Sequence, residues 1–289
     1  MVLIEDGILK ISIHPKGAEL QSIYNKSNKT EYMWSGDPAF WGKHSPVLFP
    51  IVGTLKKDTY YYKDKAYTLT RHGFARDKEF SVSNQKPASV TFTLLSDEAT
   101  LAVFPFTFRF DINYMVITDT LKVTYLITNT GKEDMYFSVG GHPAFKLPLA
   151  YENSYDEYIL EFNETEEAPR WPISTEGLIE NKPTPFFDHT EQIALKKELF
   201  CNDAIVLKQL KSTTVRLMSE TTDPGLLIDY CGFPYLGIWA AKDADFVCIE
   251  PWCGIADSVD TNQQIAEKEG INKLVAGQQF ERTWSVKVY

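Results

Sequence analysis

Two of the five histidines in this chain lie in local sequences suited to acid–base chemistry. His72 lies between two arginines, in the segment Arg71-His-Gly-Phe-Ala-Arg76. His142 follows two glycines at the end of a strand-like run, in Gly140-Gly-His-Pro-Ala-Phe145. Glycine beside a polar side chain lets the backbone approach a ligand closely, and the proline biases His142 toward an extended backbone. For each histidine taken alone, a hydrogen-bonded loop residue is the ordinary alternative.

A carboxylate and a tryptophan close a strongly apolar run, Phe246-Val-Cys-Ile-Glu-Pro-Trp252. Burying the carboxylate of Glu250 at the end of this strand is costly unless it is paired or functional. Burial also moves a glutamate pKa upward, toward the range of a general base. Trp252 can offer its ring face to the C–H surface of a sugar. A structural ion pair is the alternative for Glu250, and a loop-capping turn is the alternative for Asp203 in Cys201-Asn-Asp-Ala204.

The elements that position these residues are predicted to be strands. Apolar and polar residues alternate through much of the chain, which is typical of strands that bury one face. Runs 106–117 and 121–128 flank a short polar break and are expected to pair as a hairpin. The other predicted strands are residues 90–95, 158–162, 204–207, 214–218, 226–230, 236–239, 246–249 and 283–289.

Helical patterns are rare, and the best two are short segments at residues 191–200 and 261–269. Many strands at short spacing with few short helices indicate an all-β sandwich or barrel-like fold, which we expect to span residues 1–289 as one domain. Residues 163–190, rich in proline, glutamate and threonine, are expected to form a long surface excursion.

The composition excludes several classes of partner. The net charge is −10 over 289 residues, which argues against a nucleic-acid or anionic-membrane partner because both need a basic surface. No apolar stretch approaches about eighteen residues, and the N-terminus lacks a signal-peptide pattern. The four cysteines include no C-x-x-C pair, so free thiols in the cytoplasm are expected. The histidines and cysteines show no zinc-type spacing, so no metal is expected.

A series of short motifs runs in order along the whole chain and resembles the aldose 1-epimerase (galactose mutarotase) family, especially its shorter bacterial branch. Each motif is weak alone, but the ordered set is specific. The motifs are Gly17-Ala-Glu-Leu20, Leu48-Phe-Pro-Ile-Val-Gly53, Arg71–Arg76, Gly140–Phe145, Asn202-Asp203, Ile249-Glu-Pro-Trp252, Glu269-Gly270 and Ala276-Gly277.

This resemblance implies a large twisted antiparallel β-sandwich with an open active-site cleft and no metal or organic cofactor. It also implies a role for each residue. His142 is expected to be the general acid that protonates the ring oxygen, and Glu250 the general base that accepts the proton of the anomeric hydroxyl. His72 is expected to hydrogen-bond near the ring oxygen, and Asp203 to hold sugar hydroxyls.

The implied reaction suits these residue types. Opening a hemiacetal removes one proton from the anomeric oxygen and delivers one to the ring oxygen, and closure from the other face gives the other anomer. A paired acid and base across the ring suffice. We therefore expect all four residues to share one cleft, with His142 and Glu250 within about 10 Å because one pyranose ring must reach both.

One position departs from the family pattern. Many relatives carry an arginine directly after the glycine of the Phe-Pro-x-x-Gly motif, whereas this chain has Thr54. Threonine cannot reproduce the multidentate contacts of arginine, although Arg71 or Arg76 can be considered for the same space.

Three functions therefore remain open: an epimerase of free hexoses, a hexose-6-phosphate 1-epimerase, and a non-catalytic sugar-binding protein. A phosphate would need a basic cluster, for which the candidates are Arg71, Arg76 and Lys146. The intact acid and base residues argue against pure binding. In each case the partner is a small sugar, and the chain is expected to act as a monomer or homodimer.

Overall fold

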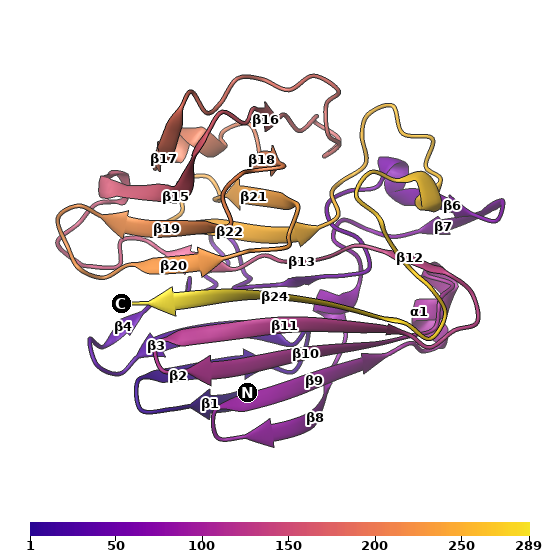
Figure 1. Ribbon diagram of the computed structural model, residues 1–289, viewed down its shortest axis with the longest axis horizontal. Coiled ribbons are helices and arrows are strands. Elements are labelled where there is room, and N and C mark those ends of the chain that lie inside the picture. The colour runs from indigo at the N-terminus through magenta and orange to yellow at the C-terminus, as the bar shows by residue number, and fades with distance from the viewer.

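The computed structural model describes residues 1–289, and nearly all of its regular structure is antiparallel β-sheet (Figure 1). The largest sheet has nine strands. In spatial order they are β17 (Thr190–Ala194), β15 (Tyr158–Glu166), β19 (Thr214–Ser219), β20 (Leu226–Asp229), β24 (Gln279–Val288), β11 (Thr120–Asn129), β10 (Phe108–Ile117), β9 (Ser89–Leu95) and β8 (Ser81–Lys86).

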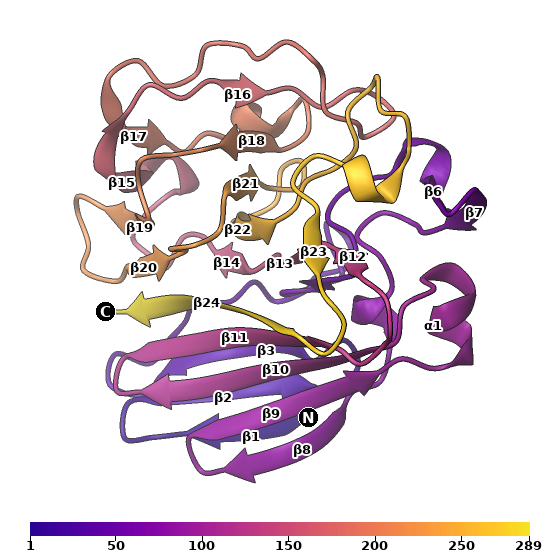
Figure 2. The same cartoon turned by 45° about the vertical axis from the view of Figure 1, so that its right-hand side comes forward.

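A second layer covers one end of this sheet. It is a four-stranded sheet of β1 (Val2–Glu5), β2 (Leu9–His14), β3 (Glu19–Asn25) and β4 (Thr30–Glu31). In both views β1 to β3 lie behind β9 to β11 (Figures 1 and 2). The layers bury facing side chains, as the fully buried Ile11, Ile13 and Phe110 show, and the expected β-sandwich is confirmed.

A seven-stranded sheet lies beside the other end of the large sheet and carries the residues singled out above. Its strands are β16 (Arg170–Trp171), β18 (Ile205–Lys208), β21 (Tyr235–Trp239), β22 (Phe246–Cys253), β13 (Val139–Gly141) and β5 (Val47–Leu48), with β14 (Ala144–Lys146) paired to β22. Two small pairs complete the strands: β12 (Met135–Phe137) with β23 (Asn272–Leu274), and β6 (Thr59–Tyr62) with β7 (Lys65–Thr68).

Helices are few and short, and none is long and apolar enough to cross a membrane. The one α-helix, α1 (Glu98–Val103), begins at Asp97, whose carboxylate accepts the Thr100 N–H in a capping box. The 3-10 turns are η1 (Lys56–Asp58), η2 (Ala75–Asp77), η3 (Tyr155–Glu157), η4 (Lys197–Phe200) and η5 (Ile265–Glu267).

The two helices expected at residues 191–200 and 261–269 do not form. The first segment divides into β17, which pairs with β15, and the short turn η4. In the second segment only η5 is helical. Here the side chains of Thr261 and Asn262 accept the backbone N–H groups of Gln263 and Gln264, which competes with helical hydrogen bonding.

The larger of two hydrophobic clusters contains 69 buried residues and runs from Ile4 to Val288. Phe49 is central to it and fully buried, and its carbonyl accepts the N–H groups of Phe74 and Ala75. Phe49 therefore links the core to the loop that carries His72. Its ring lies 4.7–6.0 Å, centroid to centroid, from those of Phe74, Phe104, Phe108, Phe110 and Phe137.

We expect Phe49→Ala to lower the free energy of unfolding by about 3–5 kcal/mol, because it removes a buried ring and leaves a cavity. Urea unfolding followed by fluorescence measures this change. The control is Tyr151→Ala, because Tyr151 is 93% exposed and its truncation should change stability by less than about 0.5 kcal/mol. Equal effects of the two substitutions would contradict the central place of Phe49.

Candidate active site

The strand β22 positions both Glu250 and Trp252, and every residue of this strand is buried. Glycines on its two neighbours make room for the Trp252 ring. A Cβ atom on Gly237 of β21 would lie 2.3 Å from the ring, and one on Gly140 of β13 would lie 2.7 Å from it. The two neighbouring strands, β21 and β13, therefore need glycine at these positions to accommodate the Trp252 ring.

His142 follows β13 directly and lies between two tryptophans. The ring of Trp41 stacks on the imidazole with a centroid distance of 4.9 Å, and Trp239 meets it edge-on at 5.7 Å. Both tryptophans also contact Phe246 of β22. This packing fixes the plane of the imidazole of His142, whose side chain is only 10% exposed.

His72 lies in a tight loop held by Gly53. The His72 N–H donates to the Gly53 carbonyl at 2.9 Å, and the Gly53 N–H donates to His72 Nδ1 at 3.1 Å. Because Nδ1 accepts this bond, the neutral ring carries its proton on Nε2. His72 and Gly73 have φ values of 68° and 70°, a left-handed conformation that is strained for histidine and common around functional sites.

Asp203 and the two arginines are linked by polar contacts. Arg71 lies 3.6 Å from an Asp203 oxygen, and Arg76 donates to the Arg71 carbonyl at 2.8 Å. Arg76 also lies 3.8 Å from Asp77. Asp203 has a φ of 72°, so it too adopts the left-handed conformation, two residues before the first residue of β18.

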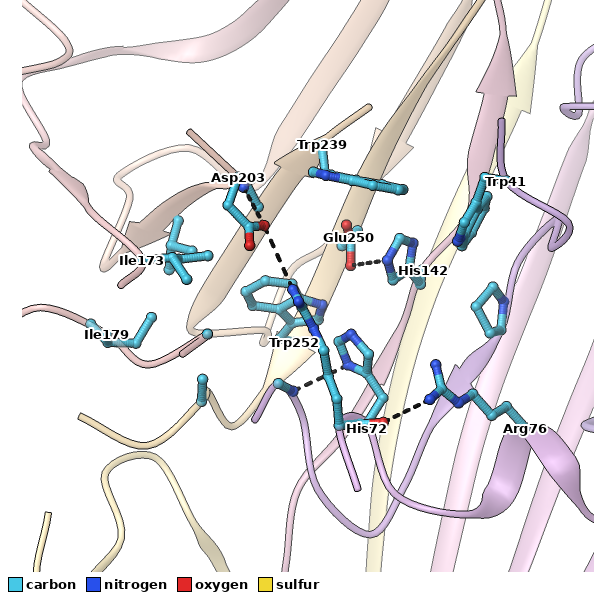
Figure 3. Close-up of a pocket in the computed structure, with 17 residues that line it drawn as sticks. Trp41, His72, Arg76, His142, Ile173, Ile179, Asp203, Trp239, Glu250 and Trp252 are labelled. Carbon is cyan, nitrogen blue, oxygen red and sulfur yellow. Dashed lines mark hydrogen bonds and ion pairs between the residues drawn. The ribbon is translucent and has the colours of Figure 1, made fainter. Parts of the chain in front are cut away.

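All seven residues predicted from the sequence line one pocket with a volume of about 350 Å³ (Figure 3). This volume is at the small end of the range of about 300–1,000 Å³ for small-molecule sites. Lys146 and Thr54 do not line the pocket. The seven residues are Arg71, His72, Arg76, His142, Asp203, Glu250 and Trp252.

The remaining walls were not predicted. Ile173 and Ile179 lie at one side of the pocket and Trp41 at the other, with Glu250 and His142 between them (Figure 3). The isoleucines belong to the segment 163–190, which was expected to be only a surface excursion. For Trp41 and Trp239, the only signal in the sequence was that an aromatic residue stands in a loop or at the end of a strand.

The segment that carries Ile173 and Ile179 also explains the environment of Thr54. A Cβ atom on Gly177 would lie 2.7 Å from the Thr54 hydroxyl oxygen, so the segment packs directly on this side chain. Thr54 therefore lies behind the pocket wall, and the guanidinium groups that line the pocket are those of Arg71 and Arg76.

His142 and Glu250 are in direct contact at the base of the pocket. The distance from His142 Nε2 to Glu250 Oε2 is 3.3 Å, well inside the expected limit. Burial raises the pKa of Glu250 well above its ordinary value, against the opposing effects of Arg71 and the Trp252 indole. Burial lowers the pKa of His142 to about 3. Both groups therefore favour their uncharged forms, and the pair shares one transferable proton.

Five buried side-chain atoms in the protein have no hydrogen-bond partner, and three of them belong to this pocket. They are His142 Nδ1, Trp252 Nε1 and Glu250 Oε2, the last of which lies 3.3 Å from His142 Nε2 but outside hydrogen-bond geometry. A buried polar atom without a partner costs about 1–3 kcal/mol. This concentration indicates that the pocket is built to contact a polar ligand.

Residues 1–266 match the family described as aldose 1-epimerase. The chain belongs to this family. It is 30% identical to the chromosomal protein LacX of Lactococcus lactis subsp. lactis, and the alignment covers 99% of this chain and 98% of LacX.

Two solved structures share the whole architecture. The galactose mutarotase related enzyme from Lactobacillus acidophilus is 35% identical, with a TM-score of 0.95, over 100% of this chain and 97% of its own. A galactose mutarotase-like protein from Lactobacillus casei is 32% identical, with a TM-score of 0.94, over 100% of both chains. The fold of this aldose 1-epimerase family member is therefore the galactose mutarotase-like β-sandwich.

We expect Glu250→Gln to stabilise the protein, and to do so more at high pH than at low pH. The unfolded chain ionises Glu250 at its ordinary pKa, whereas the folded protein resists ionisation up to a higher pH. The wild type therefore loses stability as the pH rises between these two values, and glutamine, which does not ionise, avoids this loss.

Urea unfolding at about pH 4 and about pH 8 measures the difference. The two proteins should be nearly equal in stability at the lower pH, and the variant should be more stable at the higher one. Glu152→Gln is the control, because Glu152 is exposed and its neutralisation should leave stability unchanged at both values. If the variant is less stable than the wild type at the higher pH, burying the ionised Glu250 carboxylate does not destabilise the folded protein, and the prediction is wrong.

Proposed function

We propose that this protein interconverts the α and β anomers of a free aldose by acid–base ring opening and closure. The observation that carries the proposal is the 3.3 Å contact between His142 and Glu250 in a pocket that is also lined by His72, Asp203 and Arg71. The ring oxygen and the anomeric oxygen are bonded to the same carbon. An acid and a base that touch each other can therefore serve both oxygens at once. The aldose 1-epimerase family membership supports an isomerase.

In ring opening, the Glu250 carboxylate accepts the proton of the anomeric hydroxyl. The bond between the anomeric carbon and the ring oxygen breaks as a carbonyl forms, and protonated His142 donates a proton to the ring oxygen. Rotation about the bond between C1 and C2 then presents the other face of the aldehyde. Closure runs the same transfers backwards, so no proton, electron or water molecule is gained or lost.

The protonation that burial favours for Glu250 and His142 fits one state of this cycle. A neutral Glu250 beside a neutral His142 is the arrangement that follows ring opening, when the open-chain aldehyde is bound. The ring-bound state needs the proton on His142 instead. Arg71 acts on both groups: it lowers the pKa of Glu250, which favours the carboxylate, and it lowers the pKa of His142, which opposes protonation of the imidazole. Moving one proton between two groups in contact changes no net charge in the pocket.

The other lining residues suit a sugar. Asp203, with its partner Arg71 at 3.6 Å, presents acceptors and donors to hydroxyl groups. The Nε2–H of His72 is a donor, because its Nδ1 is already engaged by Gly53. Trp252 and Trp41 supply apolar surface for the C–H faces of the ring. A pocket of this kind needs no redox carrier for the proposed reaction.

We expect Glu250→Gln and His142→Asn each to reduce catalysed mutarotation by about 10²–10⁴-fold, because each removes one proton-transfer group. Polarimetry on freshly dissolved α-anomers of glucose, galactose and other aldoses measures the rate. The double variant should lose little beyond either single variant, since the two groups act as one unit.

Lys146→Met is the matched control, because Lys146 is a charged residue on β14 outside the pocket, and its rate should equal that of the wild type. Near wild-type rates for Glu250→Gln would remove Glu250 from the role of the base. A wild type that binds sugars without catalysing mutarotation of any aldose would favour the binding-protein alternative.

Phosphorylated hexoses are the second candidate substrates, and the observation that favours them is the presence of two arginines in the pocket. Each arginine already has an acidic neighbour: Arg71 has Asp203, and Arg76 has Asp77. Lys146 does not contribute. The net charge of −10 also gives no long-range attraction to a dianion.

We therefore expect a higher kcat/KM for free glucose or galactose than for the corresponding 6-phosphates. Mutarotation of both forms under the same conditions measures the ratio. A sharp fall in phosphate turnover on Arg76→Gln, together with a preference for phosphates in the wild type, would support the phosphate alternative and leave the acid–base assignment unchanged.

A further inference from the structure

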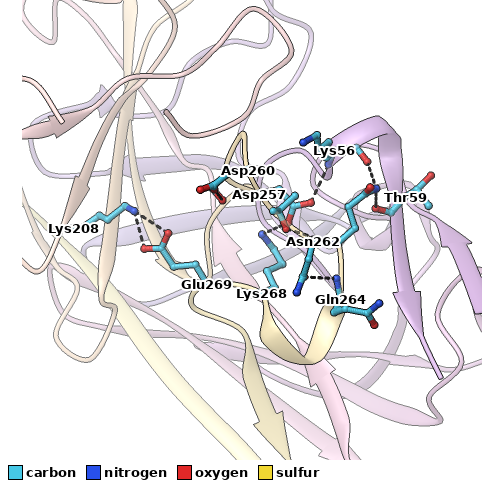
Figure 4. A network of polar contacts seen from close by, with 12 residues as sticks. Lys56, Thr59, Lys208, Asp257, Asp260, Asn262, Gln264, Lys268 and Glu269 are labelled. Atoms are coloured by element: carbon cyan, nitrogen blue, oxygen red, sulfur yellow. Dashed lines mark hydrogen bonds and ion pairs between the residues drawn. The ribbon is translucent and has the colours of Figure 1, made fainter. Parts of the chain in front are cut away.

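A buried ion pair lies behind the pocket wall, outside the residues that line it. Lys268 Nζ lies 2.9 Å from Asp257 Oδ1, and their side chains are only 3% and 2% exposed (Figure 4). Replacing such a pair with apolar residues of similar size is often neutral or stabilising, so the pair is weak evidence for stability. We therefore look to the surrounding geometry for another role of this pair.

Asp257 joins three segments of the chain through four hydrogen bonds. Its Oδ1 accepts Lys268 Nζ, and its Oδ2 accepts the backbone N–H of Lys56 at 2.9 Å. Its own N–H donates to the Thr54 carbonyl at 2.9 Å, and its carbonyl accepts the Ile179 N–H at 2.8 Å. The N–H and all three oxygens of Asp257 therefore each have a partner.

Each segment joined in this way carries part of the pocket. Gly53 precedes Thr54 and donates to His72 Nδ1, which sets the tautomer of that histidine. Ile179 forms part of the apolar wall, and Ala256 lines the pocket beside Asp257. Gly53 and Ala256 are also in close contact, because a Cβ atom on Gly53 would lie 2.5 Å from that of Ala256.

A second set of bonds holds the same segment from its other side. Gln263 Nε2 donates to the carbonyls of Lys56 and Thr59 at 2.8 and 2.9 Å, and Lys56 Nζ donates to the Val259 carbonyl at 2.6 Å (Figure 4). The loop between β22 and β23 is therefore hydrogen-bonded to residues 54–59 at several points. The ion pair lies within this loop, and Asp257 Oδ2 connects it to residues 54–59 by accepting the Lys56 N–H.

We propose that the Asp257–Lys268 ion pair is a positioning device that holds the Gly53 N–H against His72 and Ile179 in the pocket wall. It touches neither the substrate nor the His142–Glu250 pair. Loosening it should therefore weaken substrate binding more than it slows proton transfer. The expected change in KM rests on the proposed function. The tautomer of His72 tests the positioning role independently, because it can be measured in the absence of catalysis.

The test is the double variant Asp257→Leu/Lys268→Met, which replaces the charges with apolar side chains and leaves no lone buried charge. We expect KM to rise by about 10- to 100-fold with a smaller change in kcat, because the pocket wall shifts while the acid–base pair stays in place. We also expect the side-chain ¹⁵N signals of His72 to leave the pattern of an Nε2–H tautomer.

The matched control is Lys208→Met/Glu269→Gln, which removes the neighbouring ion pair at 2.7 Å (Figure 4). That pair makes no hydrogen bond to residues 53–56, so both measurements should equal those of the wild type. A folded Asp257→Leu/Lys268→Met protein with unchanged KM and unchanged His72 signals would overturn the proposal.

If the double variant does not fold, Gln263→Ala decides the question. It removes two hydrogen bonds from the same segment without touching a buried charge, and it should shift KM and the His72 signals in the same direction by a smaller amount. An unchanged Gln263→Ala protein would count against the proposal. A wild type that shows no mutarotation would refute the proposed function, and the His72 signals would still test the positioning role.

Discussion

The contact between His142 and Glu250 is the constraint on which the rest of the site depends. Two ionisable groups are buried against each other, and burial alone makes each prefer its neutral form. Such a pair remains in place only if the surrounding structure holds it. The sheet supplies Glu250 on a fully buried strand, and two tryptophans clamp the imidazole. Gly140 and Gly237 serve the same strand, because they leave room for the Trp252 ring to pack against the neighbouring strands.

The sequence predicted the strands and the polar site residues much better than it predicted the walls. Alternating runs such as β10 and β11 carry their own signal, since each buries one face. Glu250 stood out because a charge at the end of an apolar run is costly. The wall residues Ile173 and Ile179 gave no signal, because apolar side chains in a polar segment are ordinary until long-range contacts place them.

The two wrongly predicted helices fail for a related reason. Residues 191–194 can satisfy a helical or an extended pattern, and pairing with β15 decides between them. In the loop that contains Gln263 and Lys268, side chains bond to the local backbone and to residues some 200 positions earlier in the chain, such as Lys56. Short-range sequence patterns hold no information on such partners. The buried Lys268 was invisible in the sequence for the same reason.

The direct contact of acid and base also separates this site from that of a hydrolase. From the sequence we expected the two groups to act across the sugar ring, whereas in the structure they are in direct contact. Inverting glycosidases keep their two carboxyl groups about 6.5–9.5 Å apart, which leaves room for a water molecule, and retaining glycosidases keep theirs about 5–5.5 Å apart. At 3.3 Å no water molecule fits between His142 and Glu250. Two adjacent groups suit a reaction in which both reacting oxygens belong to one carbon and in which nothing leaves the substrate.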